Sequence, residues 1–503
     1  MIAAPHWWVH LPPGSSDVDL AAGGSLPGAF TAAWAADPGR VVLSTLDGAR
    51  LTADELATRT SGAAGRYAAA GLAPGDRVLL SAGTSVDLVV AYLAALRYGL
   101  TVVPANPGSP GAELTRLVSG AEPALAVLDS PVRLGDARIP VTTPDLASLP
   151  RSGGPVDLDH ANPWDIALII YTSGTTGRPK GVPLSHANLL ASAHAVRVAW
   201  RWQPDDRLGL CLPLFHVHGL GVGLHGTLVT GASATLMPRF EPAAVAAAIT
   251  DDGATMFFGV PTMYHRLAGS AHLSSLAGLR LAVSGSAPLP VGLHAALRDG
   301  CGQVVLERYG MTETVMLVSN PYDGERRPGT VGFPLPGVEV RLAPRTGGVT
   351  EIEVRGPNVI SGYLDDPAAT AAAFTVDGWL RTGDLGELDP DGYLRISGRA
   401  KELIISGGYN VYPREVEEAL REHPGVADAA VVGVPSAEWG ETVVAFVVAA
   451  DPADPAGTDA LTASLADWCA GRLTGYKRPR EWRFVAAIPR NALGKIERHR
   501  LRS

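Results

Sequence analysis

Apolar and polar positions alternate between two periods along most of the chain. Residues 51–71 and 86–99 place apolar side chains at helical spacing, whereas residues 74–83 and 101–107 resemble turns and buried strands. The same alternation returns at residues 294–310. Strands that alternate with helices in this way are typical of parallel sheets covered by helices. The pattern therefore predicts an α/β fold.

The pattern changes after about residue 330. Residues 329–364 contain short β-like runs separated by glycine and proline, which is typical of a small β-barrel or sandwich. The residues after 413 resemble a helix, two strands and a helix, and about 100 residues are enough for a separate domain. We expect an N-terminal domain over 1–400, with the barrel at about 325–400, and an α+β C-terminal domain over 401–503.

Composition narrows the class of protein. Of the 503 residues, 46% are hydrophobic and 18% are charged, which fits a globular chain, and the net charge of −9 gives no general footprint for nucleic acid. Cys211, Cys301 and Cys469 lie far apart and form no zinc or disulfide pattern. The N-terminus does not look like a signal peptide, and no apolar run reaches the roughly 18 residues of a membrane helix. We expect a cytoplasmic protein with no membrane or nucleic-acid partner.

The stretch after residues 166–171 carries the most chemistry. A buried-type strand runs directly into Thr172-Ser173-Gly174-Thr175-Thr176-Gly177-Arg178-Pro179-Lys180. Glycines let backbone N–H groups converge on an anion, the hydroxyls add donors and Lys180 adds positive charge. This is the chemistry of a polyphosphate cradle without the Walker spacing. The alternative interpretation is a flexible surface loop of small polar residues.

YTSGTTGRPKG resembles the phosphate-loop signature of the adenylate-forming superfamily, which includes acyl-CoA synthetases, peptide-synthetase adenylation domains and firefly luciferase. The resemblance extends from about Leu51 to Arg498, with further motifs in the family's order. It implies two parallel-type sheets with helices, a small β-barrel and a mobile C-terminal lid. It also implies ATP and Mg²⁺, an acyl-AMP intermediate, and coenzyme A as the thiol substrate that displaces AMP.

The resemblance also implies the nucleotide site. ERYGMTET supplies Tyr309, which can stack on a base, and Glu313, which can hold Mg²⁺ through oxygen. Asp384 and Arg399 are similar to the family's ribose-binding pair, although a lone aspartate of this kind is usually a turn residue. The full nucleotide set is Thr172, Ser173, Gly174, Thr175, Thr176, Gly177, Lys180, Ser286, Ala287, Pro288, Glu307, Arg308, Tyr309, Gly310, Thr312, Asp384 and Arg399.

A third group of residues is expected to perform and gate the chemistry. The implied catalytic residues are Lys495, Thr172, Glu313 and His216, and a flexible ammonium such as Lys495 can stabilise the transition state of adenylation. Lys401 is the implied hinge. Rotation there would bring Ser406, Gly407, Gly408, Tyr409 and Lys477 to coenzyme A, although the basic cluster around Lys477 also fits a solvated face.

Two further expectations concern partners. No carrier-protein segment follows residue 498, which favours a free-standing ligase over a peptide-synthetase module. A lysine acetyltransferase acting on Lys495 is a candidate partner, because acetylation would remove the charge of that residue.

The identity of the acid substrate is predicted from three stretches of the sequence that are similar to malonyl-CoA synthetases: LPLFHVHGL, MPRF and DGATMFFGVPTMYHRL. Arg239 lies in an apolar run with no acidic residue before Glu241, and an unpaired buried guanidinium is costly. The resemblance implies that Arg239 pairs with the carboxylate of malonate that is not activated. The alternatives are that Arg239 reaches solvent, or pairs with Glu241 or Asp251.

The expected acyl pocket is Arg239, His216, His218, Ser284, Gly310, Met311 and Met316. Methionine adapts its shape, so methylmalonate is a second candidate for the small-molecule dicarboxylate. Two other functions stay open. One is a short- or medium-chain monocarboxylate–CoA ligase with a structural Arg239, and the other is a non-catalytic nucleotide-binding relative.

Overall fold

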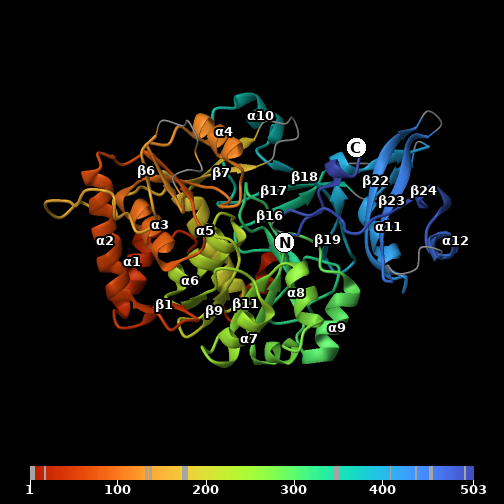
Figure 1. The fold of residues 1–503 in the computed structure, drawn as a ribbon, viewed down its shortest axis with the longest axis horizontal. Coiled ribbons are helices and arrows are strands. Elements are labelled where there is room, and N and C mark those ends of the chain that lie inside the picture. The colour runs from red at the N-terminus through yellow and green to blue at the C-terminus, as the bar shows by residue number, and fades with distance from the viewer. Residues whose placement is uncertain are drawn as a thin grey trace.

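The computed structural model describes residues 6–15, 18–130, 134, 139–172, 179–343, 350–407, 409–436, 439–451, 457–491 and 494–502. Figure 1 shows a broad N-terminal body, coloured red to cyan, with the blue C-terminal part at one side of it. No helix of the described residues is long and apolar enough to cross a membrane.

Two helix-covered sheets form the N-terminal body. The first has the strand order β6-β5-β3-β4-β7-β8 and is parallel except for the β7–β8 pair. Its strands are β3 (Arg77–Ser81), β4 (Thr101–Pro104), β5 (Leu125–Leu128), β6 (Val141–Thr142), β7 (Ile166–Thr172) and β8 (Lys180–Ser185).

The second sheet has the order β15-β14-β13-β12-β11-β9-β10-β1-β2, with a parallel centre and antiparallel edges. Its strands are β1 (Val41–Thr45), β2 (Arg50–Thr52), β9 (Arg207–Leu210), β10 (Ser233–Leu236), β11 (Met256–Gly259), β12 (Leu281–Ser284), β13 (Leu306–Tyr309), β14 (Val318–Ser319) and β15 (Phe333–Pro334). The α/β fold with two parallel-type sheets is confirmed.

Helices cover these sheets, and several begin at a side-chain cap. Thr52 and Glu55 form a capping box at the start of α2, and Ser185 and Asn188 form another at α5, which satisfies otherwise free backbone donors. The helices of the body are α1 (Leu26–Ala36), α2 (Ala53–Ala69), α3 (Val86–Tyr98), α4 (Gly111–Ala121), α5 (His186–Ala199), α6 (His225–Thr230), α7 (Pro242–Thr250), α8 (Pro261–Ala268), α9 (Val291–Cys301) and α10 (Pro367–Ala373).

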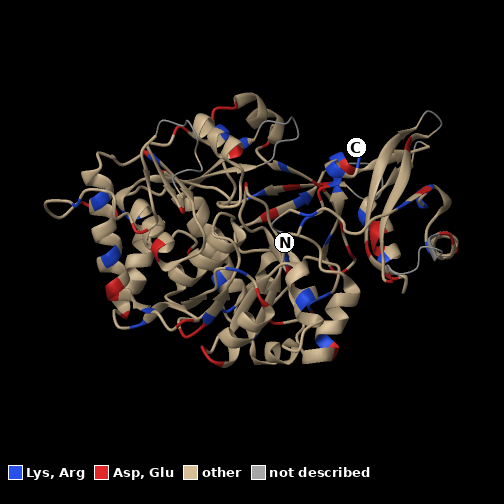
Figure 2. Ribbon diagram, viewed as in Figure 1, with Lys and Arg blue, Asp and Glu red and all other residues tan. Residues whose placement is uncertain are grey.

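Both faces of each sheet are buried, which explains the unbroken apolar runs of the strands. Leu80 of β3 packs into the central core between the sheets, whereas its neighbour Leu79 packs against the α4 side. In the second sheet Phe258 of β11 faces the same central core, and Phe257 faces α8 and α9. Figure 2 accordingly shows long stretches of the body without a charged residue.

A four-stranded antiparallel sheet follows, in the region where the sequence predicts a barrel. It contains β16 (Glu339–Leu342), β17 (Thr350–Arg355), β18 (Leu380–Leu388) and β19 (Leu394–Arg399). The next sheet belongs to the C-terminal part and contains β20 (Ile404–Ser406), β21 (Tyr409–Val411), β22 (Val426–Ser436), β23 (Gly440–Ala449) and β24 (Glu481–Phe484), with α11 (Pro413–Arg421) and α12 (Gly457–Ala470). Only the short turn Ala400–Glu402 and Leu403 separate β19 from β20. The domain boundary at residue 401 stays a prediction.

Candidate active site

Three side chains from distant segments meet at the end of β13. Asp384 and Arg399 lie opposite each other in the β18–β19 pair, and Arg399 Nε is 2.8 Å from Asp384 Oδ1. The Tyr309 hydroxyl donates to Asp384 Oδ2 at 2.5 Å. A carboxylate has further acceptor positions, so this arrangement keeps a fixed acceptor for sugar hydroxyls beside an aromatic ring. These are the side chains for which the sequence predicts contacts with ribose and base.

A second cluster lies where the phosphate loop leaves and rejoins the first sheet. Thr172 of β7 and Lys180 of β8 are direct partners in the antiparallel pair. Lys180 Nζ lies 4.7 Å from the ring centroid of Tyr363, and the Tyr363 hydroxyl donates to Glu313 Oε1 at 2.9 Å. Tyr363 therefore links the Lys180 end of the predicted loop to Glu313. The loop residues Ser173, Gly174, Thr175, Thr176 and Gly177 lie outside the described residues.

The donor set around Glu313 fits a cation that arrives with its own ligands. Among the described residues, no group of three or more acidic, histidine or cysteine side chains could enclose a metal ion. Mg²⁺ is usually held by one or two carboxylates plus substrate phosphates and water, so a single buried carboxylate is sufficient.

Glu307, expected near the nucleotide, forms hydrogen bonds with the protein backbone. Its carboxylate accepts the N–H groups of Leu289 at 3.0 Å and Gly329 at 3.2 Å. Burial raises the pKa of Glu307 to about 7. The side chain therefore anchors the segment that follows the expected adenine residues Ser286, Ala287 and Pro288. Ser286 itself has a positive φ of 67°.

The next residue of the same strand, Arg308, is a buried guanidinium with two unused nitrogens. Nε and Nη2 have no hydrogen-bond partner, and none of the ion pairs among the described residues includes Arg308. Burial lowers the pKa of Arg308 to about 9, so the group is still charged at neutral pH. Because successive side chains of a strand point to opposite faces, Arg308 lies on the other face from Glu307 and Tyr309. The sequence places Arg308 with the nucleotide, whereas its surroundings belong to the expected acid pocket.

Two histidines and a serine line the space near Arg308. Burial lowers the pKa of His216 to about 4 and holds that of His218 well below its usual range, with a contribution from the charge of Arg308. His218 Nδ1 lies 3.2 Å from Ser286 Oγ, while His218 Nε2 and Ser284 Oγ have no partner. His218 also begins the π-helix His218–Leu224, a distortion that often marks functional sites. Neutral polar side chains around an unpaired guanidinium are chemically suited to an anion.

Arg239 does not lie in this pocket. Its side chain is 83% exposed, and its Nε is 3.5 Å from Glu241 Oε1. The expectation of a buried, unpaired Arg239 is therefore wrong, and the alternative pairing with Glu241 is the one found. The physical reason is its position just beyond the carboxyl end of β10, where the chain turns toward α7. A direct role of Arg239 in acid binding stays a prediction.

The turn after β13 contributes the remaining expected residues. Gly310 packs so closely that a side chain there would overlap the carbonyl oxygen of Val315. Met316 is buried, and Met311 and Thr312 are partly buried. Close packing thus restricts the backbone conformation of the turn after β13, which lies between the expected acid pocket and the expected nucleotide site.

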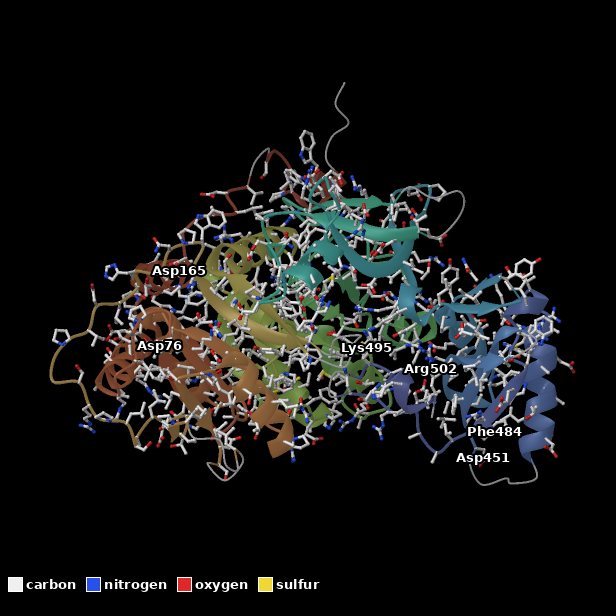
Figure 3. All side chains as sticks on the ribbon, turned by 90° about the horizontal axis from the view of Figure 1, so that it is seen from above. Asp76, Asp165, Asp451, Phe484, Lys495 and Arg502 are labelled. Carbon is white, nitrogen blue, oxygen red and sulfur yellow. The ribbon has the colours of Figure 1, made fainter. Side chains whose placement is uncertain are left out.

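Lys495 reaches the site from the C-terminal part. It lies between the N-terminal body and the blue C-terminal part in Figure 3. Burial, followed by the charge of Arg399, lowers its pKa to about 8, and its charge in turn lowers the pKa of His216. Lys495 therefore lies between the ribose-side pair and the acid pocket. The sequence motif alone predicts its role but not its position.

Of the residues expected at coenzyme A, Ser406 ends β20, Tyr409 begins β21 and Lys477 lies in the short helix Gly475–Lys477. Ser406 is buried, the Gly407 N–H donates to the Trp439 carbonyl at 2.8 Å, and exposed Tyr409 stacks on Tyr476 with ring centroids 4.6 Å apart. Lys477 forms an ion pair with Glu415 at 2.6 Å. Gly408 lies outside the described residues. Lys401, the expected hinge, is exposed on the turn before β20.

Comparison with known proteins identifies the family. A model of AMP-binding enzymes matches residues 30–364, and a model of the C-terminal domain of these enzymes matches residues 415–495. The chain belongs to the AMP-binding enzyme family. The predicted membership of the adenylate-forming superfamily is thereby confirmed.

Individual relatives of this AMP-binding enzyme are acid–CoA ligases. The sulfoacetate–CoA ligase of Cupriavidus necator is 41% identical over 485 residues, covering 92% of this chain and 94% of its own. The crystal structure of ATP-bound MatB from Rhodopseudomonas palustris has 38% identity and a TM-score of 0.87, covering 95% of this chain and 98% of its own. A malonyl-CoA ligase with methylmalonyl-CoA and AMP bound has 44% identity and a TM-score of 0.66, covering 96% and 99%.

The sequence gives no sign of two residues that contact the candidate site of this AMP-binding enzyme. Tyr363 contacts both Lys180 and Glu313, yet it lies in a short loop with no motif of its own. Thr262 of α8 lies against Gly494, one residue before Lys495. Neither contact has a local signal, because each joins segments far apart in the chain.

Proposed function

We propose that the protein is an ATP-dependent acid–CoA ligase whose acid carries a second anionic group. Malonate is the proposed substrate, and methylmalonate is the next candidate. The observation that carries this proposal is Arg308, a buried and charged guanidinium with two nitrogens that lack partners. A hydrocarbon tail would leave that charge unpaired, whereas a carboxylate or sulfonate would pair with it.

The proposed reaction has two steps. An oxygen of the acid's carboxylate attacks the α-phosphorus of ATP, which forms acyl-AMP and releases pyrophosphate. The thiol of coenzyme A, losing its proton, then attacks the acyl carbon and AMP leaves. Lys495 would stabilise the negative charge that redistributes in the first step, and its position between Asp384 and His216 suits that role. Glu313 would hold Mg²⁺ brought by the phosphates.

The structural comparisons support a change of domain arrangement between these steps. The product complex is more identical to this chain than ATP-bound MatB, yet it has the lower TM-score. A different orientation of the C-terminal part would explain this inversion. Here Lys495 is docked at the site, which fits the arrangement for adenylation. Rotation at Lys401 would replace it with the β20–β21 hairpin for the attack of coenzyme A.

Sulfoacetate is a second candidate acid. A sulfoacetate–CoA ligase is among the relatives, and sulfoacetate, like malonate, pairs an activated carboxylate with one further anion. Arg308 could bind either group. The two candidates therefore share the argument for the second anion and differ in the shape of that anion.

The test is AMP release in the presence of coenzyme A with malonate, methylmalonate, sulfoacetate and butyrate. We expect malonate to exceed butyrate by two or more orders of magnitude in kcat/KM, as in sites built around a polar partner. Butyrate at the level of malonate would refute the second-anion proposal. Sulfoacetate above malonate would keep that proposal and change the acid.

A further inference from the structure

The hairpin that carries Lys495 is closed by its own backbone. The Asn491 N–H donates to the Lys495 carbonyl at 2.9 Å, and the Lys495 N–H donates to Asn491 Oδ1 at 3.0 Å. Arg490 and Ile496 form an antiparallel bridge just outside this pair. The described residues of the hairpin thus form a narrow finger, with Lys495 on its returning arm.

Arg490 ties this finger to the C-terminal sheet. Its Nη1 donates to the Gly494 carbonyl at 2.7 Å, directly beside Lys495. Its Nη2 is 2.6 Å from Asp428 Oδ2 on β22, and Asp428 is also 3.2 Å from Arg421 of α11. A guanidinium offers donors in a rigid fork, so one side chain can hold two points at a defined separation. Arg490 therefore fixes the end of the finger relative to the edge strand β22.

A second arginine holds the chain after the finger. Arg498 is 3.0 Å from Glu402, in the turn at the expected hinge, and 2.6 Å from Glu417 of α11. The finger touches the N-terminal body at Gly494, whose backbone lies against Thr262 of α8. The contacts of Arg490 and Arg498 all lie within the C-terminal part, so they would persist when that part rotates.

We infer that Arg490 is a positioning residue for adenylation, which holds the Lys495 finger at the height and angle that its docking against Thr262 requires. This inference rests on the proposed function, because it assumes that Lys495 acts in the first half-reaction only. The hydrogen bonds of Arg490 go to the Gly494 carbonyl and to Asp428, so its effect is transmitted through the finger. A misplacement of about 1 Å can lower a rate by roughly 100-fold.

The experiment measures the two half-reactions separately in Arg490→Ala, Arg490→Lys and wild-type protein. The first is acid-dependent exchange between ATP and pyrophosphate, run with the acid that the wild type uses best. The second is thioester formation from supplied acyl-AMP and coenzyme A. We expect Arg490→Ala to lose roughly 100-fold in exchange and to keep the second half-reaction. Arg490→Lys should recover part of the loss, because a lysine can pair with Asp428 but cannot also hold the Gly494 carbonyl.

Two controls separate positioning from general damage. Arg483→Ala removes another C-terminal arginine, which pairs with Glu481 and lies over the ring of Phe446, and it should leave both half-reactions unchanged. The double variant Arg490→Ala/Lys495→Ala should still form the thioester from supplied acyl-AMP at the rate of the wild type, because neither residue acts in that half-reaction. Equal loss of both half-reactions in Arg490→Ala, or full exchange activity, overturns the inference. A wild-type protein that supports no exchange with any acid would instead refute the proposed function.

Discussion

Exchanging Arg308 for methionine tests the basis of the proposed substrate. Methionine has a similar length and no charge, and its flexible side chain can fill the space beside Gly285. A side chain at position 285 itself would overlap the Arg308 guanidinium. The variant should therefore keep the fold. Removing an unpaired buried charge is neutral or stabilising when an apolar group of similar volume replaces it. A melting temperature no lower than that of the wild type is the first expected result.

The size of the effect on activity follows from the two free nitrogens. Hydrogen bonds that involve a charged group contribute about 1.5–3 kcal/mol each. Two such bonds to the second anion would contribute about 3–6 kcal/mol, which corresponds to a loss of roughly 10²–10⁴ in kcat/KM for malonate. Butyrate makes no such bonds and should be used as well as before or better. The ratio of kcat/KM for malonate to that for butyrate should thus fall by at least about 100-fold.

Arg239→Met is the matched comparison. The side chain of Arg239 is 83% exposed and already near Glu241, so its removal should leave the same ratio almost unchanged. If Arg239→Met loses malonate while Arg308→Met does not, the assignment from burial is wrong and the interpretation from sequence is restored. If Arg308→Met loses both acids equally, the arginine is structural and the second-anion proposal fails.

Three further predictions concern pH and packing. Lys495→Ala should abolish ATP–pyrophosphate exchange and spare thioester formation from supplied acyl-AMP. In the wild type this lysine has a pKa of about 8 and acts when charged, so kcat/KM for adenylation should fall as the pH rises above that value. The pKa of Glu307 is raised from 4.5 to about 7, so folding disfavours its ionised form, and the protein loses stability as the pH rises between those values. Glu307→Gln cannot ionise. In thermal unfolding it should be more stable than the wild type at pH 8 but not at pH 4. The added methyl group of Gly310→Ala would overlap the Val315 carbonyl, so this variant should lower both the melting temperature and the rate of adenylation. In the control Gly292→Ala in α9 the methyl group meets nothing within 4 Å, so the variant should stay active and its free energy of unfolding should rise by about 0.5–1 kcal/mol. Equal behaviour of the two glycine variants would contradict the packing argument.

The fold could be predicted from the sequence because its signals are local. Strands buried on both faces leave continuous apolar runs, and helices leave a period of 3.6 residues, so the chain itself reveals the layered body. The motifs around Asp384 and Arg399 were equally local, and the structure brings these residues together at 2.8 Å. What the sequence does not contain is the meeting of Tyr363 with Lys180 and Glu313. That contact depends on how a loop after β17 folds back over the first sheet.

The two arginines show why burial of a single side chain is difficult to predict from its neighbours. Arg239 follows an apolar run, but that run is the buried strand β10, and the chain has left the core by the time it reaches the arginine. Arg308 lies within β13, between Glu307 and Tyr309, in a stretch that is more polar in sequence. Inside a strand buried on both faces, every side chain is enclosed whatever its polarity. A charged residue within a predicted central strand is therefore a stronger indicator of an anion site than one just beyond the strand's end. In this chain that criterion selects Arg308. It is accompanied in the sequence by Gly285 on the neighbouring segment, because a residue without a side chain leaves room there for the guanidinium.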